Sequence, residues 1–351
     1  MNGIEKVRLV DIAAEVNVSR AVVGRVLLGS GSSSIGVSER KARLIRDVAG
    51  RMGYQPNRVA QQLRGVRSKI IGVLSEISPS QVSEERLDCL AVEADKHGYR
   101  IIIGRIAGSQ NNIVPYLNDF LSRGCETFVF LRQLPDADGK LQEYLKNIPI
   151  PVLCCEDEFQ DIPFFSIDRA DGIRQAIDHL HAKNYRRIGI IVSDRKISTM
   201  IQRLKGYEGA MAENIPGLAK KLIYSADIQY APKTEAPEWK ELTKQAVKHL
   251  VLNQKADAII APDDIWACHL MRELQSRGLS VPQAIGIVGF DNTQPAMLYS
   301  PSITSIDQNS HEFAAQVMNF ISNFENGGDL NKNTRLIIKP QLVTRESTAR
   351  I

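Results

Sequence analysis

Apolar residues near the start of the chain recur at the spacing of two short helices. The first stripe is formed by Leu9, Ile12, Ala13 and Val16. The second is formed by Val23, Val26 and Leu27, in a helix expected from about Arg20 to Leu28. Between them, Asn17 tolerates the left-handed conformation that ends a helix, and Ser19 can cap the next one. Two short helices joined by a three-residue turn predict a helix-turn-helix.

A third helix is expected after these two. Its apolar stripe is formed by Ala42, Ile45, Ala49 and Met52. Ser38 is expected to cap it, Val37 stands at hydrophobic-staple spacing from Ala42, and Gly53 is expected to end it. Three short helices of this kind are enough for a small N-terminal head.

The segment from Tyr54 to Arg64 predicts a further helix of about seven residues, which Asn57 can cap. A helix this short is marginal in water and needs a partner surface, which DNA could supply. Leu63 would then be an exposed apolar residue. Two interpretations remain open: a linker helix with Leu63 packed on the head, or a leucine wedge for the minor groove of DNA.

From Lys69 onward, short apolar runs alternate with amphipathic helices. The runs are Ile70–Leu74, Tyr99–Ile103, Thr127–Leu131, Pro151–Cys155, Ile188–Val192, Ala258–Ala261 and Ile285–Phe290. This alternation predicts parallel sheets with helices on both faces, an α/β architecture. So many units exceed a single sheet, and two lobes are therefore expected.

Polar side chains follow several of these runs, at the strand ends where open α/β sheets bind ligands. They are Ser75 and Glu76, Asp168, Asp263 and Asp264, and Asp291 with Asn292. Because a carboxylate can accept several hydroxyl hydrogen bonds, this set suits a polyhydroxylated ligand. The alternative is that some of them cap helices, and Asp264 is expected to cap the helix over Ile265–Gly278.

Charge is distributed unevenly along the 351 residues. Residues 1–69 hold 13 Lys and Arg against 5 Asp and Glu, a net charge of +8, and the remainder holds 31 against 35, a net charge of −4. A basic head on a mildly acidic body indicates a polyanion as the partner of the head. The alternative is a solvated basic surface.

The start of the second helix is where such a head would contact bases in the major groove. The residues there are Arg20 and Ala21, with Arg25 one turn further on. An arginine can bond two acceptors of guanine at once, and an alanine methyl can contact the thymine methyl. The alternative is that the two arginines are exposed or bind phosphate.

Other classes of protein find little support in the sequence. No run approaches the roughly 18 apolar residues of a membrane helix, and no secretory signal is evident, so a cytoplasmic location is expected. The five cysteines are expected to be reduced and packed as small hydrophobes. His179 and His181 would point away from each other on a helix, so no metal site is expected. No catalytic motif and no cofactor motif is recognisable.

Two blocks of the head resemble the LacI/GalR family of transcriptional regulators. Residues 7–27 form the first block, and residues 37–38, 52–57 and 60–64 form the second. The resemblance implies a DNA-binding set of Ser19, Arg20, Ala21, Arg25, Asn57, Ala60 and Leu63. Of these, Ala60 and Leu63 would enter the minor groove from a hinge helix.

The head also departs from the family pattern. Asn17 stands where the family usually has Gly, and Val22 and Gly24 stand where it usually has Thr and Ser. These last two positions often contact phosphate in the family. The loop over 28–36 is a few residues longer than usual and is expected to be flexible.

The rest of the chain resembles the same family and, through it, the periplasmic sugar-binding proteins. Residues 203–207 are similar to an Arg-x-x-Gly-aromatic motif, residues 287–292 to a characteristic strand, and residues 301–306 and 340–347 to the closing segments. The resemblance implies an effector-binding set of Ser75, Asp168, Arg203, Asp263 and Asp291. Glu76 departs from the usual small or polar residue, and Arg169 from the usual Asn.

These features predict a helix-turn-helix head over 1–56, a hinge helix and linker over 57–68, and an effector-binding and dimerisation domain over 69–351. Lobe 1 is expected to hold about 69–167 and 293–326, and lobe 2 about 168–292 and 327–351. The predicted protein is a homodimeric repressor of a near-palindromic DNA operator, controlled by a small effector, expected to be a sugar or a sugar derivative. A sugar-binding protein without a DNA function is the alternative.

Overall fold

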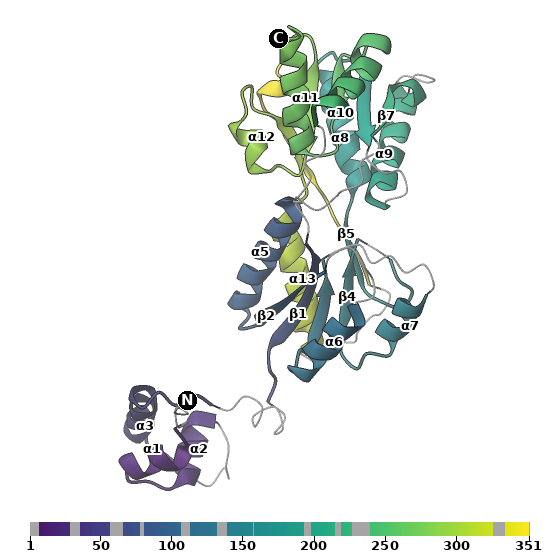
Figure 1. The fold of residues 1–351 in the computed structure, drawn as a ribbon. Coiled ribbons are helices and arrows are strands. Elements are labelled where there is room, and N and C mark those ends of the chain that lie inside the picture. The colour runs from purple at the N-terminus through teal and green to yellow at the C-terminus, as the bar shows by residue number, and fades with distance from the viewer. Residues whose placement is uncertain are drawn as a thin grey trace. The chain divides into compact units, whose positions relative to one another are not determined.

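The computed structural model describes residues 7–28, 36–56, 66–77, 81–106, 113–131, 139–156, 158–192, 198–214, 219–226, 239–325 and 334–350. The chain divides into two compact units, Met1–Ser68 and Lys69–Ile351, which are called the head and the body (Figure 1). Within the described ranges, no helix is long and apolar enough to cross a membrane.

The described part of the head folds into α1 (Leu9–Glu15), α2 (Arg20–Leu28) and α3 (Glu39–Arg51). One fully buried residue from each helix, Ile12, Val23 and Ile45, contributes to a shared core. Ser38 caps α3, because its Oγ accepts a hydrogen bond from the backbone N–H of Lys41 at 3.4 Å. The predicted helical head and the cap of its third helix are confirmed.

The described part of the body contains two six-stranded sheets, one in each lobe. In lobe 1 the strand order is β11 (Arg335–Ile338), β5 (Phe164–Ile167), β4 (Val152–Cys155), β3 (Thr127–Phe130), β1 (Ile70–Glu76) and β2 (Arg100–Ile106). In lobe 2 it is β12 (Gln341–Val343), β10 (Thr304–Asp307), β9 (Gly286–Phe290), β8 (Ala258–Ile260), β6 (Ile188–Val192) and β7 (Ile223–Ser225). Every pairing is parallel except that of β10 with β12. The predicted architecture of two α/β lobes with parallel sheets is confirmed.

Helices cover both faces of the lobe 1 sheet (Figure 1). α5 (Gln81–Lys96) and α13 (Ser310–Glu325) pack on one face, and α6 (Ile113–Ser122) and α7 (Lys140–Lys146) on the other. Alternate residues of β1 supply the two cores, with Val73 in the first and Leu74 in the second. Gly72 lets α6 approach closely, since a Cβ there would lie 2.5 Å from the ring of Phe120.

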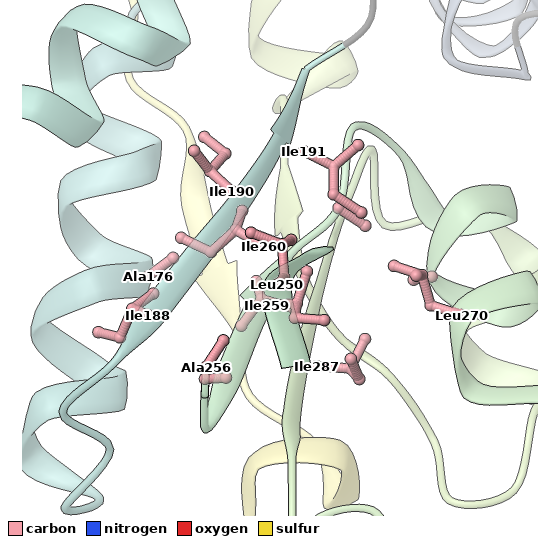
Figure 2. Packing of buried hydrophobic residues seen from close by; sticks show 14 of the residues in the cluster. Ala176, Ile188, Ile190, Ile191, Leu250, Ala256, Ile259, Ile260, Leu270 and Ile287 are labelled. Atoms are coloured by element: carbon pink, nitrogen blue, oxygen red, sulfur yellow. The ribbon is translucent and has the colours of Figure 1, made fainter. Parts of the chain in front are cut away.

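Lobe 2 has the same layered construction. Its helices are α8 (Arg169–Ala182), α9 (Ser198–Asn214), α10 (Trp239–Val247), a π-helix (Lys248–Asn253), α11 (Asp264–Ser276), α12 (Gln294–Leu298), and two 3₁₀ turns, Ala219–Leu222 and Glu346–Thr348. In β6, Ile188 and Ile190 lie on the side of α8, where Ala176 packs, and Ile191 lies on the opposite side (Figure 2). The predicted apolar runs are thus strands, and central ones such as β6 are buried and need hydrophobic residues on both faces. The run Tyr99–Ile103 differs, because it lies in the edge strand β2, where Ile103 is exposed.

In the described body the chain passes between the lobes three times. The crossings lie at Asp168, at 308–309 and at 339–340. The predicted lobe ranges need correction after residue 292. Because β10 pairs with β9, lobe 2 continues to Asp307; because β11 pairs with β5, residues 335–338 belong to lobe 1.

Candidate nucleic-acid interface and effector site

A short turn joins α1 to α2 in the head. Asn17 has a φ of 50°, in the left-handed region. The Oγ of Ser19 accepts a hydrogen bond from the backbone N–H of Val22 at 3.4 Å, at the start of α2. The predicted turn and cap are confirmed, and they produce the helix-turn-helix geometry.

The N-terminal end of α2 presents Ser19, Arg20 and Ala21 on the surface, where a recognition helix would reach base edges. Arg25, one turn further on, is half-buried. Val22 packs against the head core instead of offering a hydroxyl group to solvent. Their contacts with DNA stay predictions.

The hinge candidates Asn57, Ala60 and Leu63 lie outside the described residues. The predicted hinge helix and its minor-groove contacts therefore also stay predictions.

Two of the predicted effector residues occupy the ends of lobe 1 strands. Ser75 lies near the end of β1 and is 3% exposed, and its Oγ has no hydrogen-bond partner among the described residues. Asp168 lies at the first lobe crossing, where its carboxylate accepts from the backbone N–H of Asp171 at 3.0 Å and caps α8. Asp168 therefore has a structural role at this position.

Arg203, on α9, is buried near the carboxyl end of β9 in the lobe 2 sheet. One of its terminal nitrogens donates to the carbonyl of Pro262, and its guanidinium carbon lies 3.6 Å from the ring centroid of Phe290, the last residue of β9. Stacking on an aromatic face suits the planar guanidinium. These contacts place Arg203 next to Asp291, the residue that follows Phe290.

Close packing of two helices accounts for the glycine, Gly206, in the motif over residues 203–207. A Cβ at this position would lie 2.5 Å from the carbonyl oxygen of Ala170, in α8. Only a residue without a side chain lets α9 pack this closely on α8, and the close packing fixes the position of Arg203 one turn earlier.

The adjacent pair Asp263 and Asp264 has roles that differ from the prediction. Asp263, not Asp264, caps α11, by accepting from the backbone N–H of Trp266 at 2.8 Å. Asp264 is 1% exposed and accepts hydrogen bonds from the Thr293 N–H at 2.6 Å and hydroxyl at 2.9 Å, and from the Ser305 hydroxyl at 2.5 Å. The expectation that Asp264 caps the helix was wrong because the helix begins one residue earlier.

The buried position of Asp264 also shifts its pKa. Burial raises its pKa, and the neighbouring Asp291 raises it further, to about 7, despite the hydrogen bonds from Ser305 and Thr293. Gly289 faces this carboxyl group, and a Cβ there would lie 2.1 Å from its Oδ1. The glycine of the characteristic strand is thus required by the buried aspartate.

Asp291 is held in a strained turn after β9. Its φ is 98° and that of Asn292 is 53°, values that L side chains rarely adopt. Three hydrogen bonds fix Asn292. Its backbone N–H donates to the Ser305 hydroxyl at 2.9 Å, its side-chain Nδ2 donates to the Asp307 carboxylate at 2.8 Å, and its side-chain Oδ1 accepts from Arg345 at 2.5 Å. The closing segment of the chain therefore helps to orient Asp291.

Gln308 connects Asp291 to a buried charged network that the sequence analysis missed. Its side-chain amide donates to Asp291 Oδ1, and its Oε1 accepts from Arg86 at 2.6 Å and from Arg169 at 3.2 Å. The same two arginines donate to Oε1 of Glu156, Arg169 at a distance of 2.7 Å. Burial alone would raise the pKa of Glu156, but the guanidiniums of Arg169 and Arg86 outweigh it and lower the pKa to about 2.

The pKa of Asp291 behaves differently. Burial raises it, and the opposing effects of Arg203, of the Gln308 hydrogen bond and of Arg86 and Arg169 do not restore it. The structure thus brings Arg203 and Asp291 together, whereas it places Asp168 and Asp263 at helix starts. The effector-binding roles of these residues and of Ser75 stay predictions.

Signals for the missed residues were present in the sequence. Arg86 lies four residues before Leu90, on the buried side of α5. Glu156 directly follows the apolar run that forms β4, which is the position from which the other candidates were selected. A charged residue on an apolar stripe and a carboxylate at a strand end both indicate a buried polar site.

Known proteins resemble this chain over nearly its whole length. The family described as periplasmic binding protein-like domain matches residues 177–348. Catabolite control protein A of Priestia megaterium is 26% identical over 323 residues, 91% of this chain and 93% of that protein. The HTH-type transcriptional repressor CytR of Escherichia coli K12 is 24% identical over 340 residues, 96% of this chain and 95% of that protein.

A solved structure has the same fold. The crystal structure of the Lac repressor dimer bound to operator and the anti-inducer ONPF matches with a TM-score of 0.79 at 22% identity, over 98% of this chain and 99% of that chain. The likeness therefore includes the head as well as both lobes.

Proposed function

Because the chain belongs to the LacI/GalR family of transcriptional regulators, we propose that it is a repressor whose affinity for an operator depends on a small effector bound in the body. The observation that carries this proposal is the pairing, in one chain, of a helix-turn-helix head with a two-lobed body. The head presents Arg20 and Ala21 at the start of α2, and the body holds Arg203 beside Asp291.

DNA recognition is assigned to the N-terminal end of α2. Arg20 and Arg25 would bond guanine acceptors, and Ala21 would contact a thymine methyl group. In a homodimer, two heads would address the halves of a near-palindromic operator in successive major-groove segments. The net charge of +8 over residues 1–69 would add attraction for phosphate that is independent of sequence.

Effector binding is assigned to the side chains between the lobes. Arg203 and Asp291 offer a donor and an acceptor for a hydroxylated ligand at the carboxyl ends of the lobe 2 strands. The chain crosses between the lobes in short segments, and the ion pair of Arg169 with Glu156 also links them, so a ligand that binds both lobes would act on their relative orientation. A coupling to DNA affinity of about 1–3 kcal/mol, or about 5–150-fold, is typical of such systems.

The proposal is tested by the binding of purified full-length protein to fragments of its source genome, at low and at moderate salt. We expect tight binding to a few fragments, with affinity that falls steeply as salt rises. Arg20→Ala should weaken this binding, and Arg174→Ala, which removes an exposed arginine of the body, should not. No binding to any fragment at low salt, with or without candidate sugars, would leave only a sugar-binding function.

A further inference from the structure

The charges buried around Glu156 do not balance. Arg86 and Arg169 are 5% and 3% exposed, and both direct terminal nitrogens at one carboxylate, that of Glu156, which is 7% exposed. Two guanidinium groups therefore share a single buried counter-charge. An uncompensated charge is costly away from water, so such an arrangement favours a further anion.

Unmet hydrogen-bonding groups point in the same direction. Both arginines use the same oxygen of Glu156 and the same oxygen of Gln308. Within the described part of the body, the donors Nε of Arg86 and Nε of Arg169 are buried without a hydrogen-bond partner. Oε2 of Glu156 is also without one, but it is an acceptor and calls for a donor such as a ligand hydroxyl group. Buried donors without acceptors are rare in folded proteins, and a ligand rich in acceptor atoms would satisfy these two.

The neighbouring carboxylates do not remove the surplus charge. Asp291 interacts most strongly with Arg203, and more weakly with Arg86 and Arg169, to which Gln308 links it. Counted together, three buried guanidinium groups therefore face two carboxylates, those of Glu156 and Asp291. Glu85 is exposed, and Asp307 is half-buried and accepts hydrogen bonds from Asn292 and Asn309. The buried groups around Glu156 thus retain one net positive charge.

We propose that the effector carries one negatively charged group, a carboxylate or a phosphate, which binds between Arg86 and Arg169. This inference rests on the proposed function and specifies its ligand class as a sugar acid or a sugar phosphate. The anion neutralises the surplus charge, and guanidinium groups match the geometry of both carboxylate and phosphate. Arg203 and Asp291 then remain available for the hydroxyl groups.

The position of the two arginines connects this anion to both lobes. Arg86 lies on α5 of lobe 1, and Arg169 is the first residue of α8, directly after the crossing at Asp168. A ligand anion held by both would join the lobes at the point where the chain passes between them. The anion-binding pair is therefore also placed to transmit ligand binding to the arrangement of the lobes.

The experiment compares acidic sugars with their neutral parents on the full-length protein. The probes are glucose, glucuronate and glucose 6-phosphate; galactose and galacturonate; and ribose and ribose 5-phosphate, at matched ionic strength. The readouts are the thermal unfolding midpoint and affinity by calorimetry. We expect at least one acidic probe to bind about tenfold or more tightly than its neutral parent, the range for one hydrogen-bonded charge. The uronate and phosphate arms identify which anion is preferred.

Two variants locate the effect. Arg169→Gln leaves Arg86 and Glu156 as a neutral pair, so the fold should persist, and it should abolish the preference for the acidic probe. Arg174→Gln removes an exposed arginine from the same helix and should leave the preference unchanged. If no acidic probe binds better than its neutral parent, or if Arg169→Gln retains the preference, the proposal fails. Binding of the ligand-free protein to genomic fragments, measured in parallel, tests the proposed function separately.

Discussion

Replacing Glu156 by Gln should destabilise the body, because it leaves two buried arginines without their shared counter-charge. The carboxylate accepts from Arg86 and from Arg169, the latter at 2.7 Å. Removing one partner from a buried ion pair typically costs about 3–5 kcal/mol. The pKa of Glu156, lowered from its usual 4.5 to about 2, corresponds to a cost of roughly 3 kcal/mol at about 1.4 kcal/mol per unit. The two magnitudes agree.

The assay is urea unfolding of the full-length protein at pH 7, followed by far-ultraviolet circular dichroism. Its pH dependence provides a second check. A carboxyl group with a lowered pKa contributes stability above its unfolded-state pKa, near 4.5, and loses that contribution as pH falls toward 2. The difference in unfolding free energy between the wild type and Glu156→Gln should therefore shrink as the pH is lowered from 5 to 3.

Glu213→Gln is the matched control, since Glu213 also pairs with an arginine of α8, Arg174, at 3.7 Å, but both side chains are at least half exposed. An exposed pair of this kind contributes about 1 kcal/mol or less. The reasoning would be refuted if the two variants unfolded at the same urea concentration, or if the Glu156→Gln deficit were the same at pH 3 and pH 7.

Three further outcomes are expected. Gly206→Ala forces a methyl group against the backbone of Ala170 and should cost about 1–3 kcal/mol. Gly209→Ala, on the same helix with nothing within 4 Å, should gain about 0.5–1 kcal/mol, and equal urea midpoints would contradict the packing argument. Because the pKa of Asp264 is raised to about 7, its protonated carboxyl favours the folded state, and stability should fall by up to about 1.4 kcal/mol per pH unit between pH 5 and 7. In Asp264→Asn this slope should be shallower; an unchanged slope would assign it to other groups. Arg25→Ala should cost about 1–3 kcal/mol at one operator base pair, measured by competition with single-base operator variants, and an unaltered base preference would exclude Arg25 from base contact.

The sequence predicts the central strands well because they are buried on both faces and read as continuous apolar runs. Short edge strands leave no such signal. In β11, for example, Arg335 and Ile337 are exposed, and the strand becomes visible only through its pairing with β5. The predicted lobe ranges fail after residue 292 for the same reason, since pairing between distant segments decides which sheet a short strand joins.

The residues of the candidate site also differ in how well the sequence predicts them. Arg203 and Asp291 are found because each lies in a short segment that resembles the family, although distant residues such as Ala170 and Arg345 fix their positions. The roles of Asp263 and Asp264 depend on the helix phase and on the space that Gly289 leaves, which is set by a strand that lies later in the chain. Glu156 is 70 residues from Arg86, so no local pattern could pair them.

The late position of β11 and β12 in the chain has a consequence for synthesis. Among the described residues, the core of the head extends no further along the chain than Tyr54, so the head can fold while the ribosome is still making the body. Neither sheet of the body, by contrast, has its full set of strands until residues 335–343 have emerged. A truncated product that stops after α13 would expose β5 and β10 as unpaired edges, which are templates for aggregation. Nonsense mutations near the end of the gene should therefore yield insoluble protein with an intact head.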